Sequence, residues 1–401
     1  MLMRLRSLQV LCLLNFFIAD VRDGLGPFLG IFLVSHHWRA EEIGLVMTVG
    51  GLAGLLATFP AGMIVDATRY KRLLIITSSL LITFSALALW YFPTSTVVIL
   101  SQIITGIAAA IVAPAIAGIT LGITGQKGFL VQMGRNEAFN HSGNMAVAVL
   151  AAITCWIWGT GSVFLLMTTM AVCAVVCTLA INKNDIDHDV ARGVEKHQGP
   201  AVSVSVLALL KRPELAVTGV TLLLFHLANA AQLPMLSMKV ASSPSGSLFT
   251  PGTYAALTVA ISQAVMIPVA LLTARYASKY GYARLIGIAR LGLPFRAAIA
   301  SFWSNEFVIF PVQALDGVGA GILGVAVPGL IASLFNGSGH INAALGLVML
   351  LQGLGASFSP ALAGAIVSHS SWSFAYMILA VIALCALFIW LIFSRHIRTV
   401  T

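Results

Sequence analysis

The sequence predicts an all-α polytopic membrane protein with twelve transmembrane helices. Of its 401 residues, 59% are hydrophobic and only 9% are charged, whereas about a quarter of a soluble domain is charged. A chain with so few charges has too little polar surface to face water all round, so its apolar side chains must face lipid. The apolar residues also form twelve separate runs, and the basic residues gather in the short segments between those runs.

Each apolar run is long enough for a bilayer core, which needs about 20 residues of helix. The runs cover 8–34, 43–65, 73–92, 95–122, 135–158, 162–182, 213–237, 253–275, 284–303, 306–334, 341–367 and 372–394. Prolines interrupt several of them, at Pro27, Pro114, Pro234 and Pro328. Membrane helices tolerate such breaks where neighbouring groups satisfy the freed backbone.

Lysine and arginine favour one side of the predicted membrane. Alternate loops contain clusters such as Arg69, Lys71 and Arg72, while the opposite side has little beyond Arg39 and Lys239. Because cytoplasmic loops are enriched in basic residues, both termini are expected in the cytoplasm. The net charge of +9 therefore predicts orientation in a lipid bilayer and does not predict a nucleic-acid partner.

The chain divides into two halves that resemble each other. We expect an N-terminal six-helix bundle over 1–182, a polar cytoplasmic linker over 183–212 and a C-terminal bundle over 213–401. With an offset of 209 to 212 residues, "FFIADVRDGL" matches "FHLANAAQLP", "GMIVDATRYKRL" matches "ARYASKYGYARL" and "SQIITGIAAA" matches "VQALDGVGAG". Parallel repeats of this kind place a substrate site near the midplane, between the halves.

The loop after the second run has a recognisable pattern. A glycine, three residues, an aspartate and a basic cluster are present as Gly62, Asp66, Arg69, Lys71 and Arg72. With twelve spans and a central cytoplasmic loop, this pattern resembles the major facilitator superfamily along essentially the whole chain. The segments "DVRDGLGPFLGIFL" and "GRNEAFNHSGN" are also similar to a bacterial subgroup whose members are mostly described only as transporters. The resemblance implies two pseudo-symmetric bundles and alternating access.

Two features differ from better-known branches of that superfamily. Gln102 stands where the fourth helix often carries an arginine, and the fifth run lacks the glycine-proline signature of drug–proton antiporters. We predict proton-coupled export of a small organic molecule such as a drug, a siderophore or a polar metabolite. The missing signature keeps proton-coupled uptake as the alternative.

Acidic residues interrupt the first apolar run. Phe16, Asp20, Asp23 and Pro27 are spaced to share one helical face, and Asp20 is close to mid-membrane. A charge facing lipid is costly, so this face must look into the bundle or a watery cavity. Removal from water favours a protonated carboxylic acid. We predict Asp20 as the proton-coupling residue and Asp23 as the second candidate. The alternatives are an anchor for a cationic substrate and an ion pair with Arg22.

Polar side chains at helical spacing in other runs are candidates for a substrate site. In the seventh run they are spaced by three residues, and in the fifth run two of them lie one to two turns inside the membrane. In the ninth and tenth runs, a basic and an acidic residue are expected to form an ion pair. The predicted substrate-facing residues are His226, Asn229, Gln232, His141, Asn144, Gln102, Gln313, Arg296 and Asp316.

Charged residues at the cytoplasmic mouth are candidates for a conformational gate. The resemblance supports this role for the cluster of Gly62, Asp66, Arg69, Lys71 and Arg72, whose ion pairs would form and break as the inner side shuts and opens. Arg135 and Glu137 form either a gate or a simple pair at a helix end.

The expected function is secondary active transport across a bacterial inner membrane by a multi-pass monomer. Its partners are a small-molecule substrate, protons (with sodium as the alternative ion) and the bilayer. No phosphate-binding loop, catalytic cluster or metal-ligand spacing occurs, so we expect no cofactor, no metal and no enzyme activity. A uniporter, channel-like protein or receptor is the alternative from another class, and the repeat and the gate motif argue against it.

Overall fold

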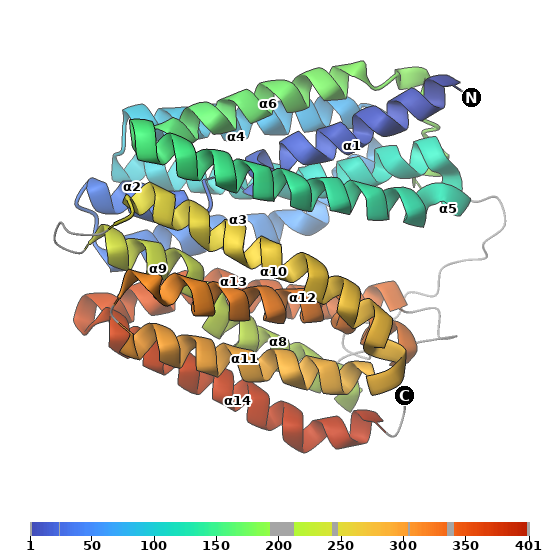
Figure 1. Cartoon of the computed structure of the whole chain (residues 1–401). Helices are drawn as coiled ribbons and strands as arrows, with labels where there is room; N and C mark the ends of the chain where they lie inside the picture. Colours follow the sequence, from blue (N-terminus) through green and yellow to red (C-terminus); the bar gives the residue numbers. More distant parts are fainter. Residues whose placement is uncertain are drawn as a thin grey trace. The chain divides into compact units, whose positions relative to one another are not determined.

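The computed structural model describes residues 2–23, 25–192, 212–242, 248–303, 305–334 and 341–398. Within them the chain is built from α-helices and short 3-10 helices (Figure 1). Eleven described helices are long and apolar enough to cross a membrane. Their ends agree with the last eleven predicted runs to within a few residues, because a run of about 20 apolar residues has no other stable place.

The backbone divides into two compact units. The N-terminal unit comprises Met1–Phe32 and Val49–Ala201, and the C-terminal unit comprises Leu33–Thr48 and Val202–Thr401. Leu33–Thr48 groups with the C-terminal unit because the start of α3 packs on α13. There the Ala361 amide donates a 3.0 Å hydrogen bond to the Thr48 hydroxyl, and Gly44 lies against the Pro360 carbonyl.

In the first half, α5 contacts α1, α4 and α6. The helices of this half are α1 (Leu2–Asp23), α2 (Pro27–Ser35), α3 (Ala40–Ala67), α4 (Lys71–Tyr91), α5 (Ser95–Trp158), α6 (Ser162–Ala180), η1 (Lys183–Asp185) and η2 (Val190–Arg192). α5 supplies two spans, Ser95–Gly125 and Val131–Trp158, and the last residue of the first span, Gly125, is non-helical. A core of isoleucine, valine, leucine and alanine lies among α1, α4, α5 and α6.

The C-terminal unit has a matching set of contacts, with α8 against α13 and α14, and α11 between α12 and α14. Its further helices are α8 (Pro213–Asn229), α9 (Gln232–Ala241), α10 (Pro251–Tyr280), α11 (Tyr282–Phe302), η3 (Glu306–Val308), α12 (Ile309–Leu334), α13 (Ile341–His369) and α14 (Trp372–Arg398).

The first span of each half is interrupted at a comparable place. α1 ends at Asp23 and α2 starts at Pro27, after Gly26 with a φ of +47°. α8 ends at Asn229 and α9 starts at Gln232. The expectation of one continuous face from Phe16 to Pro27 is therefore wrong. Proline has no amide hydrogen for the preceding turn, and a glycine tolerates the positive φ that breaks the helix.

The internal repeat also appears in the helix crossings. An added Cβ on Gly106 would collide with the Gly50 carbonyl, and one on Gly317 would lie 2.5 Å from the Ser262 carbonyl. Gly106 and Gly317 are the matched positions of the sequence repeat, and both crossings bring a small residue against backbone, as close-packed membrane helices require.

Candidate functional site

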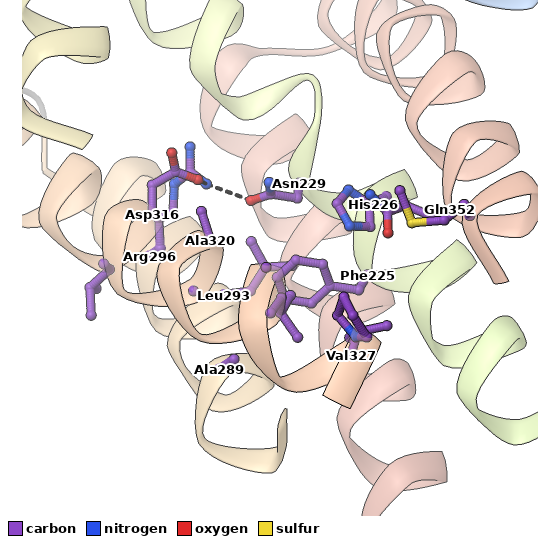
Figure 2. Close-up of a pocket in the computed structure, with 16 residues that line it drawn as sticks. Phe225, His226, Asn229, Ala289, Leu293, Arg296, Asp316, Ala320, Val327 and Gln352 are labelled. Carbon is purple, nitrogen blue, oxygen red and sulfur yellow. Dashed lines mark hydrogen bonds and ion pairs between the residues drawn. The ribbon is translucent and has the colours of Figure 1, made fainter. Parts of the chain in front are cut away.

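The C-terminal unit contains a cavity of about 260 Å³. α8, α11, α12 and α13 line it (Figure 2). Phe225, Leu293, Leu323 and Val327 form much of its apolar wall. The polar side chains that reach it are His226, Asn229, Arg296, Asp316 and Gln352. An apolar cleft with a few converging polar groups is the usual form of a small-molecule site.

An ion pair lies at one end of this cavity. Arg296 Nη1 is 2.5 Å from Asp316 Oδ1, and the two side chains are 1% and 14% exposed. The same nitrogen donates to Asn229 Oδ1, as the dashed line in Figure 2 marks. Asp316 Oδ2 accepts a 2.6 Å hydrogen bond from the Ser262 hydroxyl. The predicted ion pair between the ninth and tenth runs is confirmed. Each side chain neutralises the charge of the other, which would be costly if left unpaired in the low-dielectric interior.

Two further nitrogens of Arg296 take no part in the ion pair. Its Nε and Nη2 atoms are buried and have no hydrogen-bond partner among the described residues. A guanidinium has five N–H donors in a planar fork that suits carboxylate and phosphate oxygens. Unsatisfied buried donors are costly, so burying the N–H groups of these two nitrogens destabilises this arrangement unless a further acceptor reaches them.

The polar stripe predicted on the seventh run is only partly present. His226 and Asn229 both line the cavity. Gln232 is fully buried and donates to the Ala228 carbonyl at 2.9 Å. The prediction assumed a continuous helix, and the break at residues 230 and 231 places Gln232 at the start of α9, where its side chain folds back on α8.

Gln313 is also outside the cavity lining. It is fully buried in α12, and both atoms of its side-chain amide lack a hydrogen-bond partner among the described residues. It precedes Asp316 by one turn on α12, so its side chain leaves the helix at an angle of about 60° from that of Asp316.

The other candidates lie in the N-terminal unit. Asp20 on α1 is half-buried, as are Gln102, His141 and Asn144 on α5. Gln102 packs against Gly50 of α3. Asp23 ends α1, and its side chain lies outside the described part of the structure.

The predicted gate cluster separates into two kinds of residue. Lys71 is fully buried and donates to the carbonyls of Val65 and Thr68 at 2.7 and 2.9 Å. Arg72 donates to the carbonyls of Thr178 and Leu179 at 3.0 and 2.8 Å. These two basic side chains therefore satisfy the free carbonyls at the ends of α3 and α6, a capping role that the sequence analysis missed.

The remaining gate candidates are accessible. Asp66, Arg69, Arg135 and Glu137 are exposed, and Gly62 is half-buried. No contact that the structure describes joins Arg135 to Glu137.

Sequence reasoning missed Arg290, a second arginine in the ninth run. It is fully buried on α11, donates to the Thr221 hydroxyl at 2.6 Å and lies 4.0 Å from the centre of the Trp390 ring. Its presence within an apolar run was a signal as strong as that of Arg296. Among the described residues, no three histidine, cysteine, aspartate or glutamate side chains are grouped to hold a metal ion.

Comparison with known proteins shows the family to which the chain belongs. The family model of the Major Facilitator Superfamily matches residues 11–294 and 253–400. Two Mycobacterium tuberculosis proteins, from strains CDC 1551 and H37Rv, are each named an uncharacterized MFS-type transporter. Each is 37% identical over 383 residues, covering 94% of this chain and 90% of the relative.

Solved structures show the same fold. The crystal structure of a mutant form of the nucleoside transporter NupG has a TM-score of 0.80 at 15% identity, covering 97% of this chain and 99% of that one. A second NupG crystal structure, without that mutation, has a TM-score of 0.77 at 14% identity, with 98% of each chain covered. The family match and the transporter relatives both cover most of the chain, and its spanning helices suit a bilayer. This multi-pass membrane protein therefore belongs to the major facilitator superfamily and is a transporter, with no enzyme activity implied.

Proposed function

We propose that this transporter moves a small polar metabolite, which binds in the cavity of the C-terminal unit beside Arg296 and Asp316. The Arg296–Asp316 ion pair, whose two residues both line the cavity, is the observation that carries the proposal. Charged residues inside membrane helices are costly and mark substrate or ion pathways. Asn229, which accepts a hydrogen bond from Arg296, lines the same cavity, so three polar side chains converge there.

The volume of the cavity limits the size of the substrate. At about 260 Å³ it falls below the roughly 300–1,000 Å³ typical of sites for drug-sized ligands. This favours a polar metabolite over a bulky drug or a siderophore.

Transport is proposed to be coupled to protons through Asp20, with Asp23 as the second candidate. In the sequence repeat Asp20 matches Asn229, which lines the cavity of the C-terminal unit. The repeat therefore supports an equivalent inward position for Asp20. Sodium is the alternative ion, because a carboxylate also suits hard cations.

The remaining parts of the proposal concern movement and placement. Asp66 and Arg69 are proposed to form and break gate contacts at the cytoplasmic mouth, while Lys71 and Arg72 hold the adjacent helix ends rigid. The protein is proposed to work as a monomer in a bacterial inner membrane, with both termini in the cytoplasm and bundles over 1–182 and 213–401.

The test is transport by the purified full-length protein in proteoliposomes, with a panel of labelled amino acids, sugars, organic acids and nucleosides. We expect saturable, protein-dependent flux of a panel member that Arg296→Gln and Asp316→Asn each reduce at least tenfold. Arg39→Gln is the matched control, because Arg39 is exposed and pairs only with Glu42 among the described acidic residues. Flux that both cavity variants leave unchanged would exclude this cavity as the binding site.

The same vesicles test coupling and direction. A pH gradient of either sign is imposed, and the sign that accelerates flux distinguishes proton-coupled export, the direction favoured by the sequence analysis, from uptake. Asp20→Asn is expected to leave substrate binding measurable while removing the response to the gradient. Gradient-driven flux of normal size in Asp20→Asn would reject Asp20 as the coupling residue.

A further inference from the structure

Buried charge in the C-terminal unit is unbalanced. Away from the ends of its described helices, the charged side chains that are not exposed are two arginines, Arg290 and Arg296, and one carboxylate, Asp316. Arg296 and Asp316 neutralise each other at 2.5 Å. Arginine keeps its charge in proteins, so Arg290 leaves one positive charge without an opposing carboxylate. His226 adds no negative charge in either protonation state.

Arg290 is fixed in place without being neutralised. Thr221 accepts from its Nη2, and the Trp390 ring covers its guanidinium. These are a neutral hydroxyl and a neutral ring. Its Nε and Nη1 atoms are buried and lack a hydrogen-bond partner among the described residues. Stacking on a tryptophan offsets part of the desolvation cost of a cation but leaves its electric field in the surroundings.

The field of Arg290 reaches the cavity. Arg290 follows Ala289 and precedes Leu293 on α11, and both of these neighbours line the cavity. At the effective dielectric constant of about 20 that suits sites in proteins, a unit charge still contributes more than 1 kcal/mol at about 10 Å. Arg290 adjoins the lining residue Ala289, so its positive charge acts on the contents of the cavity.

We infer that the cavity accepts a small organic molecule with one negative charge, such as a carboxylate, and that Arg290 sets this preference. Arg296, which lines the cavity, is the nearest basic residue to the anionic group, and Arg290 supplies the uncompensated charge. This inference rests on the proposed function, because it specifies the cargo of the same cavity. Binding of the anion brings the buried charge of the unit to zero.

The test uses ligands that share a shape and differ in charge. Nicotinate, nicotinamide and 3-(aminomethyl)pyridine form one such set, and lactate, lactamide and 1-amino-2-propanol form another. Protein-dependent flux of each is measured in proteoliposomes containing the full chain, beside the neutral compound uridine. We expect the anion of at least one set to move about tenfold faster than its neutral and cationic partners, the effect of one charge at roughly 10 Å.

Two pairs of variants separate charge from structure. Arg290→Gln should remove the preference for the anion, whereas Arg290→Lys should retain it. Thr221→Glu places a carboxylate beside Arg290 and should also remove the preference, whereas Thr221→Gln, of equal size, should not. The Thr221 pair decides the question if Arg290→Gln does not fold. A purely structural role would change the flux of all members of a set alike.

The outcomes are distinct. A preference for neutral or cationic members, or an anion preference equal in Thr221→Glu and Thr221→Gln, overturns the charge inference and leaves the transport proposal standing. Absence of protein-dependent flux for these sets and for the wider metabolite panel overturns the proposed function, and this inference fails with it.

Discussion

The two halves of the chain share a backbone plan and differ in their buried polar groups. The matched glycines Gly106 and Gly317 make equivalent crossings, and the first span of each half is broken. Asp316 pairs with Arg296 in the C-terminal unit, whereas its repeat position in the N-terminal unit, Thr105, is neutral. The comparison teaches that the repeat preserves helix packing while the chemistry of each half has diverged.

The largest expected effect comes from breaking the charge asymmetry between the halves. Asp316→Asn leaves Arg296 as a second uncompensated cation, which for a buried pair costs about 3–5 kcal/mol. The double variant Arg296→Leu with Asp316→Leu should recover thermal stability, because it leaves no unpaired charge. Thermal unfolding of the purified protein in detergent measures both. A double variant no more stable than Asp316→Asn would show that the pair is not the origin of the loss.

The second largest effect tests whether the helix crossings of the two halves are equivalent. Gly106→Ala and Gly317→Ala each place a Cβ within 3.0 Å of backbone, so each should destabilise its crossing by about 3 kcal/mol, the upper end for overpacking. Gly134→Ala and Gly346→Ala are matched controls, since a Cβ there meets nothing within 4 Å. Folded yield after size-exclusion chromatography and the melting temperature report the outcome. If only one crossing glycine is sensitive, the two crossings are not equivalent.

A smaller effect should show a difference between the halves at a pair of matched arginines. Arg72 and Arg284 are matched in the repeat, but only Arg72 makes a described contact with carbonyls, those of Thr178 and Leu179. Arg72→Gln should cost about 2 kcal/mol, as expected for hydrogen bonds to a charged group. Arg284 is exposed, so Arg284→Gln should change stability by less than about 0.5 kcal/mol. Equal losses in a thermal melt would contradict the capping role of Arg72.

The smallest effect concerns a buried amide network in the N-terminal unit. Asn136 donates to the Thr120 hydroxyl at 3.0 Å and accepts from Gln132 at 2.9 Å. Thr120→Val removes one of these bonds and should cost about 0.6 kcal/mol, the average for such bonds between membrane helices. Thr77→Val is the control, because its exposed hydroxyl bonds only to carbonyls of its own helix among the described contacts. A loss several times larger would mean that the network acts as a unit.

Much of the architecture was predictable because hydrophobic run length is decisive in a membrane. The ends of the last eleven runs, the repeat and the Arg296–Asp316 ion pair were all predicted. The capping of helix ends by Lys71 and Arg72 was not, because a basic side chain near a helix end can satisfy carbonyls or face water with little difference in sequence pattern. Arg290 was overlooked, although its place in an apolar run already marked it.

The sequence by itself determined that this chain spans the membrane, where most of its helices lie and which positions repeat. These follow from the cost of exposing polar groups to lipid, a property of each segment alone. Apart from the Arg296–Asp316 ion pair, only the tertiary structure decided which polar side chains meet. The break between α8 and α9 separates Gln232 from His226 and Asn229, while the packing of α11 on α14 covers Arg290 with Trp390. Such contacts depend on the rotation and register of neighbouring helices, which no single segment specifies.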